Sequence, residues 1–261
     1  DLSALASVAL NPANPYDHLF RASGAGSVVD LTAMSTLDNG LALYLDSGGG
    51  VVAPNMVDLT GNVSVLSGSS LTLPGATSVV DMTLNVNGTL SLPVLTTFSN
   101  VTANLAESGV LTLPELLSTS GSNITLSGSS LFDSPKLTGM TGVGNSTRFI
   151  SVSTDSTFDA PLLATLENVR LFAANGAALV LPALTGFTFD VSCGEQIIGS
   201  SGVRTSDGEP SLVSLPLLEE ISYITPNGCG GFSIWASGGG HLDLSQLTSV
   251  VLNPANPYDH L

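Results

Sequence analysis

The chain has 261 residues, of which 43% are hydrophobic and only 10% charged, and its formal net charge is −16. This charge repels a phosphate backbone, so we expect no nucleic-acid partner, and it disfavours an anionic membrane surface. No apolar run approaches the roughly 18–20 residues that cross a bilayer, and no signal peptide is recognisable, so we expect no membrane span in this segment.

The first nineteen residues return at the other end of the chain. Residues 1–19 read DLSALASVALNPANPYDHL, and residues 243–261 read DLSQLTSVVLNPANPYDHL. The two stretches differ at only three positions, and chance does not produce this agreement. We therefore interpret residues 1–242 as one complete long tandem repeat and residues 243–261 as the start of the next, within one continuous solenoid.

An Asn- and Pro-rich segment follows the first apolar stretch. Its composition predicts an ordered, turn-rich loop. The loop could pack along neighbouring coils, contact another chain or bind a ligand, and packing is the simplest of these roles. Similar excursions are expected near 139–157, 190–211 and 222–241. The candidate interaction residues are Asn11, Pro12, Asn14, Pro15, Tyr16, Asp17 and His18.

A shorter motif, apolar-x-apolar-Pro-x-Leu, recurs inside the long repeat. Clear copies occupy residues 71–76, 111–116 and 179–184. Ten copies fit the 242-residue unit. In two copies Thr32 and Ser245 stand at the proline position. The positions three before and two after it are apolar in every copy, and the position one before it is apolar in all but one, at Ser134. This alternation followed by a bend predicts a short strand with one buried face, repeated from coil to coil.

A second short strand follows in most coils, as at Val63–Val65 and Ile124–Leu126, and a glycine usually closes it, as at Gly68 and Gly128. Glycine tolerates the positive φ of a tight corner. A coil of about 20 residues suits a parallel β-helix and also falls in the leucine-rich-repeat range. We favour an all-β, right-handed parallel β-helix of about ten coils with longer loop excursions, because no helical stretch separates the strands.

This pattern resembles large secreted β-helix repeat proteins, such as bacterial adhesins and surface fibre proteins. The resemblance covers the whole chain but is architectural, because it rests on coil length and phase rather than on a family-specific motif. It implies an extracellular or cell-surface location.

The only two cysteines are Cys193 and Cys229. They follow the proline positions of consecutive coils, Pro182 and Pro216, at nearly the same distance. Stacked strands lie about 4.8 Å apart, close to the separation that a disulfide needs. We expect a disulfide between them and therefore an oxidising compartment, and the alternative is two unrelated buried thiols.

Five Asn-x-Ser/Thr sequons lie at similar phases, and we expect them along one flank of the solenoid. They can carry glycans that add solubility and protease resistance. Asn also suits turns, and Asn168 occupies the same phase without a sequon. The N-glycosylation candidates are Asn62, Asn87, Asn100, Asn123 and Asn145.

No catalytic signature is present: the sequence lacks the common hydrolase, metalloprotease, P-loop and redox motifs. The three histidines are His18, His241 and His260, and the last is the repeat copy of the first. We expect no enzymatic activity, no catalytic or metal-binding residue and no cofactor.

Two functions remain. The first is a structural subunit of an extracellular fibre or filament whose partners are further copies of itself, joined end to end, and covalent glycans. The second is a cell-surface adhesin or carbohydrate-binding module. Its candidate stacking residues are Tyr16, Phe20, Tyr223 and Trp235.

Overall fold

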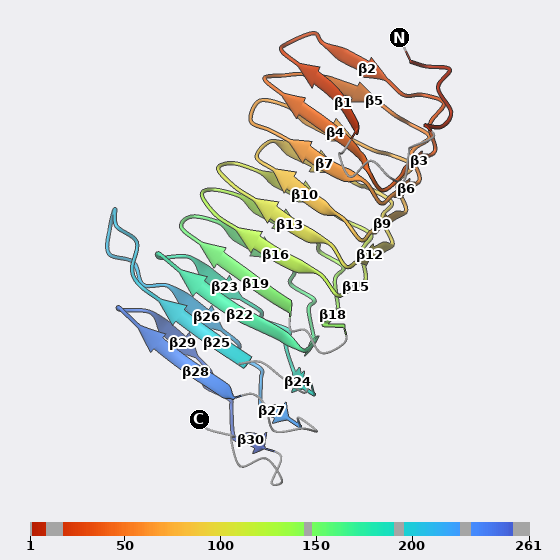
Figure 1. Ribbon diagram of the computed structural model, residues 1–261. Coiled ribbons are helices and arrows are strands. Elements are labelled where there is room, and N and C mark those ends of the chain that lie inside the picture. The colour runs from red at the N-terminus through yellow and green to blue at the C-terminus, as the bar shows by residue number, and fades with distance from the viewer. Residues whose placement is uncertain (1, 9–17, 144–147, 191–195, 225–230, 253–261) are drawn as a thin grey trace.

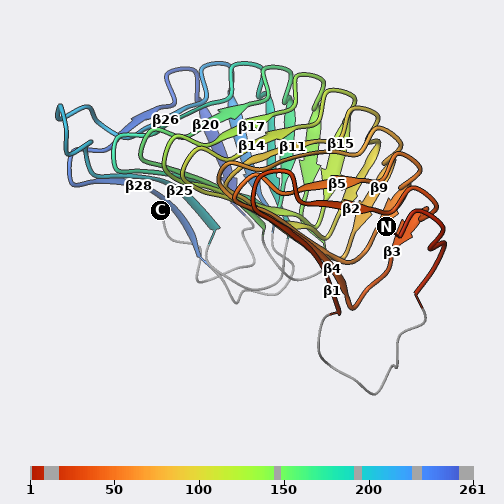
Figure 2. The ribbon, with the colours of Figure 1, turned by 90° about the horizontal axis from the view of Figure 1, so that it is seen from above.

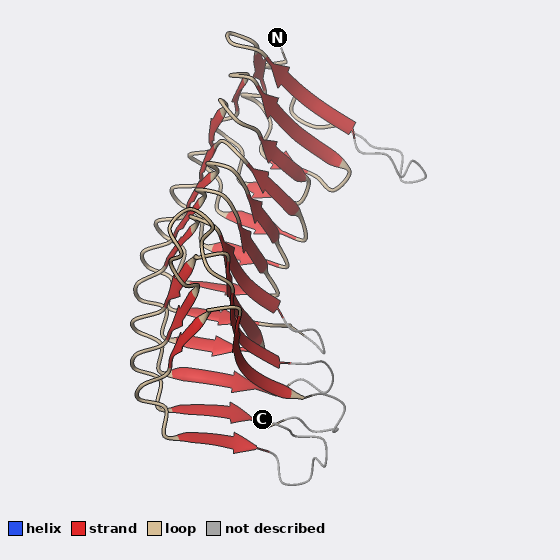
Figure 3. Ribbon diagram, turned by 90° about the vertical axis from the view of Figure 1, so that its left-hand side faces the viewer, coloured by secondary structure: helices blue, strands red, loops and turns tan. Residues whose placement is uncertain are grey.

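The computed structural model describes residues 2–8, 18–143, 148–190, 196–224 and 231–252. These residues form thirty strands and no helix, and every pairing between strands is parallel. Figure 1 and Figure 3 show the strands stacked coil upon coil between the two ends of the chain. The expected all-β parallel solenoid is therefore confirmed.

Each coil contributes one strand to each of three faces. The first face is a ten-stranded sheet, which confirms ten coils. Its strands are β1 (His18–Ser23), β4 (Leu41–Asp46), β7 (Asn62–Val65), β10 (Thr83–Val86), β13 (Thr102–Leu105), β16 (Asn123–Leu126), β19 (Arg148–Ser153), β22 (Val169–Ala174), β25 (Gln196–Ser201) and β28 (Phe232–Ser237).

The second face carries the strand that precedes the proline and is broken into three sheets. The first sheet contains β2 (Val28–Asp30) and β5 (Gly50–Val52). The second contains β8 (Ser70–Thr72), β11 (Thr89–Ser91), β14 (Val110–Thr112), β17 (Leu131–Asp133) and β20 (Thr157–Asp159). The third contains β23 (Ala178–Val180), β26 (Leu212–Ser214) and β29 (His241–Asp243).

The third face is again a ten-stranded sheet, formed just after the proline turn. The sequence pattern predicted only two strands per coil. That prediction was wrong, because each coil also contributes this third strand. The strands are β3 (Thr36–Leu37), β6 (Asp58–Leu59), β9 (Ser78–Val80), β12 (Thr97–Ser99), β15 (Ser118–Ser120), β18 (Gly139–Thr141), β21 (Thr165–Glu167), β24 (Gly186–Phe189), β27 (Glu220–Tyr223) and β30 (Ser249–Leu252).

The proline occupies the corner between the second and third faces. In the coil of Pro114, the N–H of Leu116 donates to the carbonyl of Leu113 at 3.3 Å, which closes a four-residue turn with proline in its second position. Proline fixes the φ that this position needs and has no N–H to lose. Equivalent bonds recur from Met34 N–H to the Leu31 carbonyl through to Leu247 N–H to the Leu244 carbonyl. The repeated motif is thus the sequence of a repeated corner.

In most coils the other two corners use a residue with positive φ. Asn100 (φ 54°) and Asn168 (φ 55°) turn the chain from the third face to the first, and Gly128 (φ 67°) turns it from the first to the second. Glycine and Asn adopt this left-handed conformation more readily than other residues. Viewed from above in Figure 2, successive coils spread like a fan around these corners.

The core runs the length of the stack. The predicted inward positions are buried in the inner coils; Leu111, Leu113 and Leu116, for example, are all 0% exposed. Ser134, the exception in the pattern, is also buried, and its hydroxyl donates to the Leu113 carbonyl at 3.2 Å. The third face adds a fourth inward position, filled by residues such as Phe98.

Candidate functional site

The second face opens between β20 and β23. These strands belong to different sheets, although their coils pair normally on the other two faces. The opening leaves a cleft of about 500 Å³ that is lined by Thr157, Asp159, Pro161 and Ala178, among others. A hollow at a break in the sheet, lined by hydroxyl and carboxylate groups, is a candidate site.

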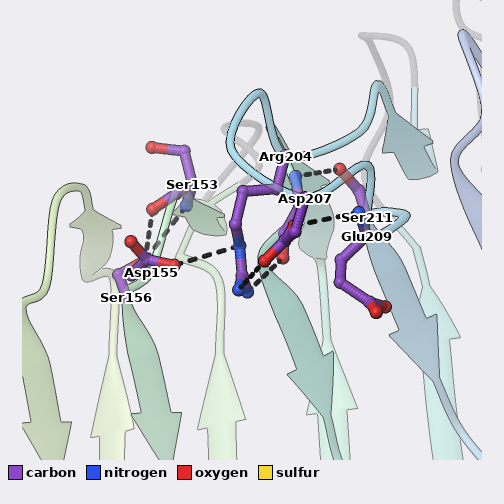
Figure 4. Close-up of polar contacts among 8 residues, drawn as sticks. Ser153, Asp155, Ser156, Arg204, Asp207, Glu209 and Ser211 are labelled. Carbon is purple, nitrogen blue, oxygen red and sulfur yellow. Dashed lines mark hydrogen bonds and ion pairs between the residues drawn. The ribbon is translucent and has the colours of Figure 1, made fainter.

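Arg204 spans the rim of this cleft. Its Nε lies 3.1 Å from Asp155 Oδ1, and one terminal nitrogen lies 3.2 Å from Asp207 Oδ2. The other terminal nitrogen donates to the Gly176 carbonyl at 3.3 Å. Figure 4 shows the guanidinium between the two carboxylates. These contacts tie the loop that carries Arg204 to two earlier coils, which gives the guanidinium a structural role.

Two carboxylates stack beside the same cleft. Asp133 and Asp159 are register partners in β17 and β20. Burial, and secondly the charge of Asp159, raise the pKa of Asp133. His241 lies apart from them, on β29 in the third sheet of the second face. Within the described ranges no group of three His, Cys, Asp or Glu residues could hold a metal ion. The pair alone does not assemble a reaction centre.

A second candidate lies on the outer surface of the first face. Phe149, Phe172 and Trp235 surround an apolar hollow of about 380 Å³, together with Arg170 and Ile197. The rings of Phe172 and Trp235 are 5.7 Å apart and tilted by 46°. Phe149 is 36% exposed. Sequence reasoning missed this aromatic patch because its members come from coils of unequal length.

Gly199 positions the aromatic patch. It is the register partner of both Phe172 and Trp235 and lies between them. A Cβ at this glycine would lie 2.9 Å from Cε2 of Trp235. The indole therefore covers the glycine and leans toward Phe172. This packing explains the ring geometry without any ligand, while the outer edges of the rings still offer an apolar surface.

Two of the stacking residues expected from the sequence are misplaced for that role. Tyr223 is 0% exposed and packs against Phe189 and Phe232 inside the core. Phe20 packs against the end of the core. The carbohydrate-stacking role expected for these two residues was therefore wrong, because both occupy inward positions of their strands. Trp235 is the one that faces outward, and Tyr16 lies outside the described residues.

The sequons do not share one flank as expected. Asn62 and Asn123 both begin strands of the first face, whereas Asn87 follows the opposite end of β10. Asn100 is exposed at a left-handed corner, and its amide nitrogen donates to Asp81 Oδ1 at 2.9 Å. The amide oxygen of Asn62 accepts the Thr83 N–H at 3.2 Å. These bonds give Asn62 and Asn100 structural roles.

Several predicted residues lie outside the described part of the chain. They are Cys193, Cys229, Asn145 and the loop residues Asn11, Pro12, Asn14, Pro15, Tyr16 and Asp17, whereas His18 begins β1. The disulfide and the interaction loop stay predictions. One observation bears on the disulfide: Gln196 and Phe232 are register partners, and each cysteine precedes its own member of this pair by three residues.

The two copies of the terminal repeat form the same turn at the two ends of the stack. Leu5 N–H donates to the Leu2 carbonyl at 2.9 Å, and Leu247 N–H donates to the Leu244 carbonyl at 3.0 Å. The first copy contacts the turn between β2 and β3, since the Ala33 N–H donates to the Ser3 carbonyl. The second copy stacks on the strand before it, where β30 pairs with β27. The first copy thus shows the contact of this segment with the coil that follows it, and the second copy shows its contact with the coil that precedes it.

No family model, curated protein or solved structure matches the chain. Within the described ranges no helix has the length and hydropathy needed to cross a membrane.

Proposed function

We propose that this chain is a repeat unit of an extracellular structural fibre, joined end to end with further copies of the same unit. The observation that carries the proposal is the stacking of the terminal repeat. Residues 243–252, the start of the next unit, continue the third face through the pairs Ile221 with Val250 and Tyr223 with Leu252. The start of the next unit thus extends the same ladder.

The rest of the molecule supports a scaffold. Its buried apolar side chains form one continuous core, and Arg204 at the rim of the cleft between β20 and β23 already contacts Asp155, Asp207 and the Gly176 carbonyl. Near-identical stacked units suit a rod, because each coil covers the open edge of the one before it. The protein is then non-enzymatic and takes no cofactor. Its sequons and its two cysteines favour a glycosylated, disulfide-bonded protein of the cell surface or extracellular space.

The test is a chain in which residues 1–242 are followed directly by residues 1–261. Ten coils at about 4.8 Å each advance the rod by about 48 Å, so small-angle scattering should report a particle longer by that amount than the 261-residue chain. A two-unit chain that scatters as two jointed bodies contradicts a continuous fibre.

A second candidate is a carbohydrate-binding adhesin, and the aromatic patch favours it. Tilted aromatic rings beside an arginine and hydroxyl groups are a surface on which sugar rings stack. A glycan array probed with the 261-residue chain and with Phe172→Ala tests this function. Saturable binding that Phe172→Ala abolishes supports this function. Absence of binding by both proteins contradicts it.

A further inference from the structure

The apolar core is incompletely covered at both ends of the stack. Phe20 in β1 and Val29 in β2 are only partly buried, and so are Ile234 in β28 and Leu242 in β29. The corresponding positions in the inner coils, such as Ile124 and Leu111, are 0% exposed. Each end therefore presents strand edges with half-covered apolar side chains.

Between several strands of the first face, the register matches the position of one corner residue. Ser201 pairs with Ser237, and each is followed by a glycine of positive φ, Gly202 (φ 78°) and Gly238 (φ 58°). The same alignment of left-handed residues holds where Ser153 pairs with Ala174, where Ala174 pairs with Ser201, and where Ser23 pairs with Asp46. In these pairs the left-handed corner residues lie opposite each other, directly after the paired strands.

Ser23 at the end of β1 is also followed by such a residue, Gly24 (φ 86°). We propose, resting on the fibre proposed above, that β1 of each following unit pairs with β28 of the preceding unit with Ser23 opposite Ser237. This register places Arg21 opposite Trp235 and Phe20 opposite Ile234. Phe20 and Ile234, both partly buried on their own, then complete each other's burial.

The side chains at this joint are compatible with the register. Trp235 leans back over Gly199, and Arg21 leans forward, with its guanidinium 5.1 Å from the centre of the Tyr44 ring and 2.7 Å from Asp46 Oδ2. The aliphatic stem of Arg21 is then free to cover the open side of the indole. The hydroxyls of Ser201 and Ser237 are 3.1 Å apart, and Ser23 would extend this hydrogen-bonded row.

Trp235 reports on the joint, because it is the only tryptophan of the unit. In the two-unit chain, Trp235→Phe in the second unit leaves one tryptophan, at the joint. Its emission should shift to shorter wavelength than in the 261-residue chain. Its acrylamide quenching constant should fall about two-fold, because strands then lie about 4.8 Å away on both sides of it.

The matched control compares Arg21→Ala in the second unit with the same substitution in the first unit. Arg21→Ala in the second unit removes the side chain opposite the joint tryptophan and should restore much of the quenching. Arg21→Ala in the first unit loses the same contacts to Tyr44 and Asp46 far from the joint and should leave quenching low. Equal effects of the two variants, or a joint tryptophan as accessible as in the single unit, overturn this register. The particle length measured by small-angle scattering distinguishes failure of this joint from failure of the proposed fibre. A full-length rod with an accessible tryptophan refutes the register at the joint but not the fibre.

Discussion

Replacing Leu111 with alanine should lower the free energy of unfolding by about 3–4 kcal/mol. Leu111 is 0% exposed in β14, and its register partners are Leu90 and Phe132. The change removes three carbon groups, worth about 0.8 kcal/mol each when buried. The remainder comes from the cavity, because both partners are fixed in parallel ladders and cannot move in to fill the space.

Urea denaturation followed by circular dichroism measures this loss. Because a stack of repeats need not unfold in one step, hydrogen exchange of the amides in β14 is a necessary second readout. The control is Thr112→Ala on the same strand, whose side chain faces outward and which should change stability by no more than about 0.5 kcal/mol. An alanine avoids placing another carboxylate opposite Asp133, the register partner of Thr112.

Equal losses from the two substitutions would refute the assignment of inward and outward positions, and with it the coil phase on which the fold prediction depends. A large loss of stability from Thr112→Ala alone would mean that the inward and outward positions of β14 are assigned the wrong way round.

Three further outcomes are expected. Asp133→Asn should stabilise the protein by about 0.5 kcal/mol at neutral pH, because it removes the cost of burying a charge and, secondly, the repulsion from Asp159. Since the folded-state pKa of Asp133 is raised above 3.8, this gain should appear as the pH rises from 3.8 through the raised value and vanish well below pH 3.8, as urea titrations at several pH values would show. Peptide mapping without reductant should recover Cys193 and Cys229 in one linked fragment, whereas two alkylated thiols would contradict the pairing. Arg204→Met should cost less than about 1 kcal/mol, because the ion pairs of Arg204 are partly exposed, yet it should speed proteolytic cleavage within residues 202–211.

The coil could be predicted because the residues of the corner between the second and third faces recur as a sequence motif. The proline of each turn and its three apolar neighbours stand at fixed offsets, so residues such as Leu111 and Leu116 could be assigned inward positions that the structure confirms. The third-face strand was missed because most of its copies are short and present a single inward residue, such as Val79 between Ser78 and Val80 or Phe98 between Thr97 and Ser99. A column of apolar residues five positions after the proline was the available signal, interrupted by Thr119.

The aromatic patch could not be predicted in the same way. Phe149, Phe172 and Trp235 lie at different distances from their nearest prolines, because the coils that carry them differ in length. Their common outward position becomes visible only when the strands of the first face are aligned. Tyr223 shows the opposite failure: it was assigned to the surface as an aromatic in an excursion, yet it fills the core.

The parallel ladders also determine how such a rod would respond to being pulled along its length. The hydrogen bonds between coils run along the axis, so tension would open them in sequence, starting with the coil at the end. A coil of about 20 residues spans about 4.8 Å of the rod but about 70 Å once drawn out, at about 3.4 Å per residue. Each released coil would lengthen the molecule roughly fifteen-fold over the distance it occupied. A fibre of these units would yield gradually and absorb work, and a bond between Cys193 and Cys229 would set a limit on how far its last coils extend.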